Sequence, residues 1–277
     1  MAYQDLEDKD CCYVNCGVYC CLCFCCFAPY CCEQTIDANF VNIDEHQRML
    51  NKYAFGNFKK ASMRKQRCIE QLIKHTKIYN DVAGRDAKNM KSTDIEVKEV
   101  WENGKSKQKY RNNLKNMSKI DFPGDLAPIK TSTLTTLAND LELDTDKEVV
   151  LFHGTKIDTM NLIMKNGFNM DYTSDNSLFG RGLYFAESYQ KSDQYVDDRN
   201  ERRDEWLTMI LARVALGKVN KTDKDHVDRP YSPEAGFDSA VAAHEKSNRK
   251  YRFREFIVAN DQQCFPEYVI IYKRLVV

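Results

Sequence analysis

Short blocks of hydrophobic residues, separated by polar stretches, follow one another along the C-terminal two thirds of the chain. Residues 95–101 alternate apolar and charged side chains, the period of two that predicts a half-buried strand. Apolar blocks predict further strands at residues 149–152, 183–185, 206–217, 251–258 and 268–275. Helical patterns are brief, at residues 108–117, 159–166 and 188–197, and residues 221–250 are expected to be mostly loop. Many short strands with few helices between them predict an α+β fold and argue against a doubly wound parallel sheet.

The N-terminal third of the chain has a different pattern. Residues 11–32 contain no charged side chain, whereas residues 44–79 place apolar side chains at the spacing of one helix face, with Asp44 as the N-cap. We therefore expect three regions. These are a cysteine-rich segment at residues 1–43, a basic helical linker at residues 44–90 and a globular domain at residues 91–277.

Composition and charge narrow the class of protein. The chain has 277 residues, of which 43% are hydrophobic and 11% aromatic, and this suits a globular core rather than disorder. The formal net charge is zero, so the whole chain carries no nucleic-acid signature. Residues 52–77 depart from this balance, with eight Lys or Arg against the single acid Glu70. The alternative explanation of this basic stretch is a solvated helix face without a special role.

Ten of the twelve cysteines lie between Cys11 and Cys32. No basic region precedes them, so we expect no secretory signal peptide, and two scattered thiols in the rest of the chain suit a reducing cytosol. We favour a segment that is S-acylated at several cysteines and lies on a membrane surface, helped by the basic helix. A metal-bound cluster, a disulfide knot and a membrane-spanning helix are the alternatives. Adjacent cysteine doublets fit zinc poorly, so no metal site is expected.

The first candidate for chemistry is the pair His153 and Gly154. His153 ends an apolar strand, and Gly154 has no Cβ, so a ligand can approach the main chain closely. Imidazole can bond a sugar hydroxyl, while the glycine backbone can bond a planar amide. The competing interpretation is a structural histidine.

The second candidate is the segment FGRGLYFAESYQKSDQYV. Two tyrosine faces, from Tyr184 and Tyr195, could stack a flat heteroaromatic ring, with the hydroxyl of Ser192 offered to an amide. Both tyrosines could equally be core residues. The third candidate is Glu267, a lone carboxylate within a strand-like apolar run, which is either a surface residue or held for catalysis.

These segments together resemble the catalytic domain of the poly(ADP-ribose) polymerase family, the diphtheria-toxin-like ADP-ribosyltransferases. The resemblance covers roughly residues 91–277 and rests on LFHGT, LFGRGLYFAESYQKSDQYV, AGFDSAV and REFIVANDQQCFPEYVIIY. It implies the ADP-ribosyltransferase fold, with two small, mostly antiparallel sheets around an NAD cleft. It also implies a catalytic triad of His153, Tyr184 and Glu267.

The resemblance assigns further roles and a function. NAD, as the substrate, would be bound by His153, Gly154, Thr155, Tyr184, Ser192 and Tyr195. Glu267 would bond the nicotinamide ribose and help activate the acceptor. The function implied is transfer of ADP-ribose, as single units or polymer, from NAD to protein acceptors. The alternatives are a non-catalytic module that binds NAD or ADP-ribose and a membrane-associated NAD glycohydrolase. We expect a cytoplasmic protein that lipidation holds at a membrane.

Overall fold

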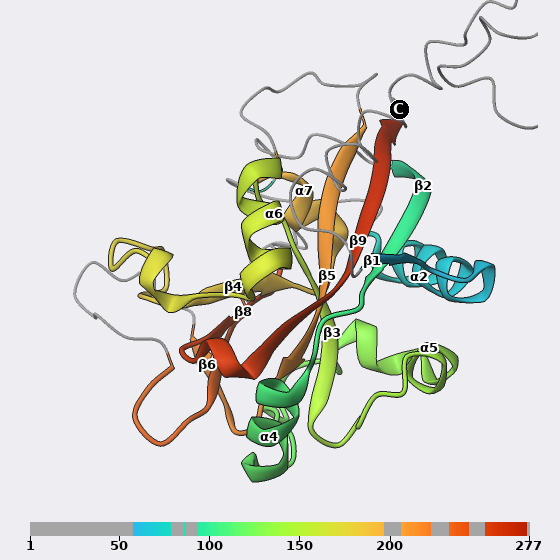
Figure 1. The fold of residues 1–277 in the computed structure, drawn as a ribbon. Coiled ribbons are helices and arrows are strands. Elements are labelled where there is room, and N and C mark those ends of the chain that lie inside the picture. The colour runs from blue at the N-terminus through green and yellow to red at the C-terminus, as the bar shows by residue number, and fades with distance from the viewer. Residues whose placement is uncertain are drawn as a thin grey trace, which may run out of the picture. The chain divides into compact units, whose positions relative to one another are not determined.

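The described strands form a single open sheet (Figure 1). They pair in the order β1-β2-β9-β5-β3-β4-β8-β7-β6, and every pair of neighbours is antiparallel except β6 and β7. The strands are β1 (Phe58–Lys60), β2 (Asp94–Asn103), β3 (Glu148–His153), β4 (Leu183–Ala186), β5 (Leu207–Ala215), β6 (Val219–Thr222), β7 (Ser239–Ala242), β8 (Glu255–Val258) and β9 (Cys264–Leu275).

The structure is a computed structural model that describes residues 58–78, 86, 94–196, 206–222, 233–243 and 253–275. All of them belong to the unit that spans residues 42–277. The cysteine-rich segment and the first part of the predicted linker helix lie outside these ranges. Within the described ranges, no helix has the length and apolar character needed to cross a membrane.

Five α-helices accompany the sheet in these ranges: α2 (Met63–Thr76), α4 (Gln108–Asn116), α5 (Thr135–Asp140), α6 (Ile157–Asn166) and α7 (Tyr189–Asp193). Three short 3-10 turns, η2 (Lys130–Thr133), η3 (Met170–Tyr172) and η4 (Asp261–Gln263), complete the elements. The predicted helices at residues 108–117 and 159–166 are confirmed as α4 and α6. The prediction of a fold that contains both helices and strands is confirmed.

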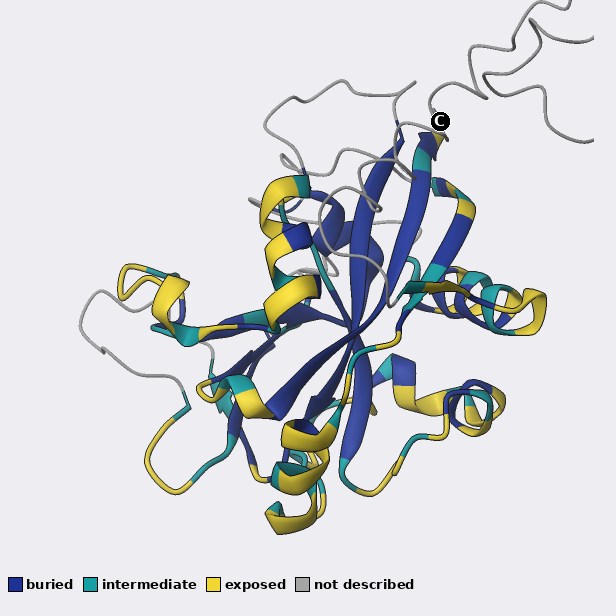
Figure 2. Cartoon of the chain, viewed as in Figure 1, coloured by how far each residue is buried: buried dark blue, intermediate teal, exposed yellow. Residues whose placement is uncertain are grey.

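Alternate residues of the central strands enter two hydrophobic cores, one on each face of the sheet. Leu151 on β3 and Ile210 on β5 pack in the core that contains Met160 of α6. Their neighbours on the same strands enter the second core, with the apolar residues of α2, α5 and α7. Because both faces are covered, all nine residues of β5 are buried (Figure 2). This explains why β5 reads as a continuous apolar run.

The prediction of two small sheets is wrong for the described residues, although the sheet has a weak joint. β3 and β4 are joined by one residue pair, Phe152 with Ala186, whereas β3 and β5 pair over six residues. Strands β1, β2, β9, β5 and β3 therefore lie on one side of the joint and the other four strands on the opposite side. Two halves that diverge after a single pair leave room between their ends.

The predicted helix at residues 44–79 is wrong in its described N-terminal part. Residues Phe58–Lys60 pair with β2 as strand β1, and the helix begins at Met63 after the N-cap Ser62, whose side chain accepts a hydrogen bond from the Lys65 amide. Four basic residues of this region pair with acids of the domain: Lys60 with Glu99, Arg64 with Asp140, Lys65 with Glu102 and Lys77 with Asp94. Much of the local positive charge is therefore neutralised within the domain.

One further expectation needs correction and another needs detail. The predicted helix at residues 188–197 is only the short α7, which ends at Asp193. Within residues 221–250, expected to be mostly loop, Ser239–Ala242 form β7, a buried strand between β6 and β8. Both segments are short, and short segments give a weak periodic signal.

Candidate active site

A cavity of about 590 Å³ lies at the joint where β3 and β4 diverge, a volume typical of sites that hold small organic ligands. Its walls come from the end of β3, from β4, from α7 and from the first residue of β8. Five residues singled out in the sequence line it: His153, Gly154, Tyr184, Ser192 and Tyr195. Thr155, the sixth, is not among the described residues that line it.

The ring of His153 is held in one orientation. Its Nδ1 lies 2.8 Å from the carbonyl oxygen of Tyr184, and its ring packs edge-on against Phe168 with centroids 5.2 Å apart. Burial lowers the pKa of His153 below its usual 6.5, and the bond to the Tyr184 carbonyl opposes this shift. The neutral ring donates Nδ1–H to that carbonyl, so Nε2 is an acceptor for a ligand hydroxyl.

Gly154 lies against the backbone of Ser192. A Cβ at position 154 would be 1.8 Å from the Ser192 carbonyl oxygen and 2.5 Å from its carbonyl carbon. No other amino acid fits here without moving one of the two segments, so the glycine is required by packing. The contact brings β3 and α7 together at the edge of the cavity.

Tyr184 fixes the turn that precedes β4. Its hydroxyl donates to the Gly180 carbonyl at 2.6 Å and accepts from the Phe179 amide at 3.0 Å. Burial raises the pKa of Tyr184 to about 12, so the phenol is protonated at neutral pH and can donate. Tyr195 is 49% exposed, and the ammonium of Lys191 lies 5.6 Å from its ring centroid. One tyrosine is thus fixed while the other is open to solvent.

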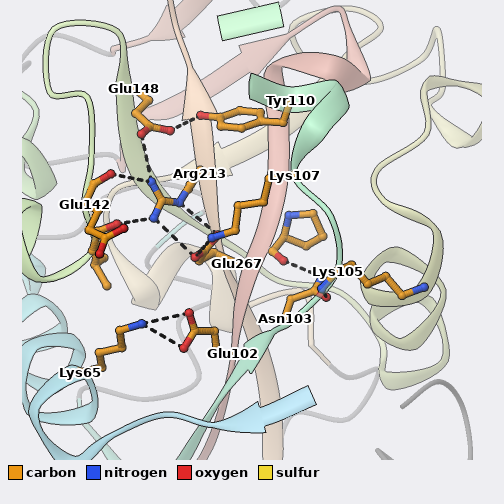
Figure 3. A network of polar contacts seen from close by, with 12 residues as sticks. Lys65, Glu102, Asn103, Lys105, Lys107, Tyr110, Glu142, Glu148, Arg213 and Glu267 are labelled. Atoms are coloured by element: carbon orange, nitrogen blue, oxygen red, sulfur yellow. Dashed lines mark hydrogen bonds and ion pairs between the residues drawn. The ribbon is translucent and has the colours of Figure 1, made fainter. Parts of the chain in front are cut away.

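The structure does not bring Glu267 to this cavity. Glu267 is 1% exposed, with Lys107 Nζ at 2.5 Å from Oε1 and Arg213 Nε at 3.1 Å from Oε2 (Figure 3). Arg213 also pairs with Glu148 at 3.0 Å, and Tyr110 donates to Glu148. Burial lowers the pKa of Arg213, but Glu267 and Glu148 raise it more, so the guanidinium keeps its charge.

Glu267 and His153 serve opposite faces of the sheet. The partner of Glu267, Arg213, donates to the carbonyls of Leu141 and Glu142, which follow α5. His153 contacts Phe168 instead, which belongs to the core on the α6 face. A carboxylate tied to the α5 face cannot reach a ligand held by the imidazole without breaking its ion pairs.

Glu255, which no sequence pattern had indicated, does bring a carboxylate to the wall of the cavity. Glu255 is the first residue of β8 and lies opposite Ala186 of β4, two residues from Tyr184. Its Oε1 lies 3.2 Å from the ammonium of Lys191. A histidine, a tyrosine and a carboxylate from three different strands therefore share one cavity.

The two glutamates are hard to tell apart in the sequence. Each precedes an aromatic and then β-branched residues, as REFIV at Glu255 and PEYVI at Glu267. Position within the strand would have separated them, because Glu255 begins a four-residue strand whereas Glu267 lies inside a twelve-residue one. Ligand-binding side chains are more often placed where a strand meets a loop than in the middle of a long buried strand.

Glu267 is expected to matter for stability. Replacing Glu267 by Gln removes a buried negative charge between Lys107 and Arg213, so the free energy of unfolding should fall by about 3 kcal/mol. Urea denaturation followed by circular dichroism measures this loss. Per folded molecule, the transferase activity that the resemblance implies should change less than tenfold. A stable variant without activity would instead support the catalytic role that the resemblance implied for Glu267.

A cavity lined by aromatic side chains and a few polar groups, at the joint of an open mixed sheet, is typical of sites that bind small organic ligands. Fold alone does not fix function, so the comparison with known families carries the assignment. Residues 74–274 match the family model described as "Poly(ADP-ribose) polymerase catalytic domain", and the chain belongs to this family. It is therefore an ADP-ribosyltransferase domain by class.

Three relatives illustrate the similarity. The chain is 25% identical to "Poly [ADP-ribose] polymerase tankyrase" of Caenorhabditis elegans over an alignment of 194 residues. This alignment covers 56% of this chain and 8% of that protein. It is 27% identical over 135 residues to human "Protein mono-ADP-ribosyltransferase PARP14", covering 47% of this chain and 7% of the relative. It is 33% identical over 93 residues to mouse "Protein mono-ADP-ribosyltransferase PARP3", covering 34% of this chain and 17% of the relative. The match thus spans less than a fifth of each relative.

Proposed function

We propose that this chain transfers ADP-ribose from NAD to side chains of acceptor proteins and releases nicotinamide. The observation that carries the proposal is the meeting of His153, Tyr184 and Glu255 in one cavity. The names of the relatives, which include mono- and poly-ADP-ribose transferases, support the same reaction class. Glu255, in place of Glu267, is the proposed catalytic carboxylate.

The cavity offers binding groups for both the nicotinamide ring and the ribose attached to it. Gly154 and Ser192 offer backbone and hydroxyl groups to the nicotinamide amide, and Tyr184 and Tyr195 offer ring faces to its plane. The neutral imidazole of His153 accepts a hydrogen bond from a ribose hydroxyl through Nε2. Each of these groups binds the substrate in a fixed orientation, which lowers the entropic part of the barrier.

NAD supplies a ribose carbon bonded to nicotinamide, a cationic leaving group that takes the bonding electrons with it. Glu255 places a negative charge beside that sugar, where positive charge develops as the bond breaks. The same carboxylate then accepts the proton that the acceptor side chain loses when it bonds to the ribose carbon. Lys191 holds the carboxylate in place through the 3.2 Å ion pair.

Incubation of the full chain with NAD labelled in its adenylate half tests the proposal. Label that becomes covalently attached to protein supports the transferase, and the length of the attached chain separates single units from polymer. Free labelled ADP-ribose without labelled protein would identify a glycohydrolase. Intact NAD after prolonged incubation would identify a non-catalytic module and would overturn the proposal. His153→Ala provides the negative control.

We also propose that the chain is cytoplasmic and is held at a membrane surface by S-acylation within Cys11–Cys32. The support is the density of cysteines among apolar residues in that segment. The basic region contributes less than its composition suggested, because four of its side chains pair with acids of the domain. Substituting serine for the ten cysteines should move the protein from the membrane fraction to the soluble fraction. Unchanged fractionation would refute the acylation.

A further inference from the structure

A second carboxylate, that of Asp86, shares the cavity with Glu255. Asp86 is 6% exposed and lines the same wall as Lys191. The Lys191 ammonium lies 2.8 Å from Asp86 Oδ1 and 3.2 Å from Glu255 Oε1. One buried cation is therefore shared between two carboxylates from separate parts of the chain.

Asp86 also connects Lys191 to the start of β8. Its Oδ2 accepts a hydrogen bond from the backbone amide of Phe253 at 3.1 Å, two residues before Glu255. Its Oδ1 accepts from Lys191 on α7 at 2.8 Å. The two oxygens of one carboxylate thus fix the distance between the helix that carries the cation and the strand that carries the catalytic carboxylate.

The arrangement sets the charge that Lys191, Glu255 and Asp86 together present to the ligand. Burial lowers the pKa of Lys191, but Glu255, Tyr195 and Asp86 raise it more, so the ammonium stays charged at neutral pH. An ion pair of Lys191 with Glu255 alone would be neutral. With Asp86 included, the three groups carry one net negative charge beside the cavity.

We infer that Asp86 is a positioning residue, which holds Lys191 so that Glu255 keeps a net negative potential toward the ribose. This inference rests on the proposed function, in which Glu255 is the catalytic carboxylate. Without Asp86, the full positive charge of Lys191 would fall on Glu255 and weaken its attraction for the positive charge that develops on the sugar. The role goes beyond packing because it depends on the charge of Asp86.

Titration of Glu255 in the unliganded protein tests the link directly. Among the described residues, the titratable groups that line the cavity together with Glu255 are Asp86, Lys191, His153, Tyr184 and Tyr195. The two carboxylate oxygens on Lys191 are at most about 6 Å apart, so removing the Asp86 charge should ease ionisation of Glu255. In the Asp86→Asn variant, the titration midpoint of Glu255 should fall by about one pH unit or more. NMR of 13C-labelled glutamate measures this midpoint.

Two further variants keep the test decisive. Asp86→Ser leaves a short acceptor for the Phe253 amide without a charge, and it should show the same fall if Asp86→Asn does not fold. Asp86→Glu keeps the charge and should restore most of the original midpoint. Glu99→Gln is the matched control, because Glu99 is a buried acid paired with Lys60 at 2.6 Å outside the cavity. It should leave the midpoint unchanged.

Kinetics add the functional part of the test. With NAD varied, Asp86→Asn should lower kcat about tenfold with little change in KM, because the lost potential acts on the developing charge. The acid limb of the pH profile should move to lower pH by the same amount as the NMR midpoint. An unchanged midpoint, or kinetics that match Glu99→Gln, would overturn the inference. Absence of any NAD turnover in the unmodified chain would instead refute the proposed function, while the titration would still decide the link.

Discussion

Replacing Glu255 by Gln is expected to lower the transfer rate by about 10²-fold or more, the usual cost of removing a key electrostatic group. The substitution keeps the shape of the side chain but removes the negative charge beside the ribose. It also removes the base that accepts the proton of the incoming acceptor. NAD turnover at saturating NAD measures the effect, and thermal unfolding checks that the variant is folded.

Glu267→Gln is the matched control for this prediction. Both variants exchange a β-strand glutamate for its amide. Glu267 is fully buried and Glu255 partly buried, and of the two only Glu255 lines the cavity. The expected result is a crossed pattern, in which Glu255→Gln loses turnover with a smaller loss of stability and Glu267→Gln does the reverse. The opposite pattern would return the catalytic role to Glu267 and leave Glu255 as a partner of Lys191.

The sequence predicted the central strands well because their apolar blocks are long and both faces of the sheet are covered. The block at residues 206–217 became β5, which is buried throughout. Shorter elements were harder to predict. Strand β7 has four residues with small side chains, and β1 has three residues, two of them lysines, so neither carries a clear period of two. Their existence depends on pairing with neighbours that are distant in the sequence.

The candidate site was predicted in part for a similar reason. His153, Gly154, Tyr184, Ser192 and Tyr195 come from two segments whose order and spacing are informative, and the cavity contains all five. The carboxylate needed long-range information. Whether Glu255 or Glu267 reaches the cavity depends on which strand lies beside β4, and the pairing of β8 with β4 decides it. No local pattern records that pairing.

The sharing of Lys191 between two carboxylates could not be seen in the sequence at all. Asp86 lies 105 residues before Lys191 in the chain, in a stretch with no recognisable pattern. Only the fold brings the two together. Charge-coupled groups of this kind are found from the structure, because their interaction depends on distance in space and not on separation along the sequence.

The second large effect is expected from Gly154→Ala, which should abolish measurable NAD binding and lower the free energy of unfolding by about 3 kcal/mol. The added methyl group would lie 1.8 Å from the Ser192 carbonyl oxygen. Ser192 cannot withdraw easily, since both of its neighbours are anchored by buried ion pairs. Lys191 pairs with Asp86 at 2.8 Å, and Asp193 pairs with Arg274 at 3.0 Å.

Because α7 is fixed on both sides of Ser192, the clash in Gly154→Ala must be relieved by moving the end of β3, which carries His153. Isothermal titration with NAD and urea denaturation measure the two effects. Gly124→Ala is the control, because a Cβ at Gly124 meets nothing within 4 Å. Normal NAD binding by Gly154→Ala would mean that α7 can shift despite its ion pairs. In that case the contact between Gly154 and Ser192 would not determine the shape of the cavity.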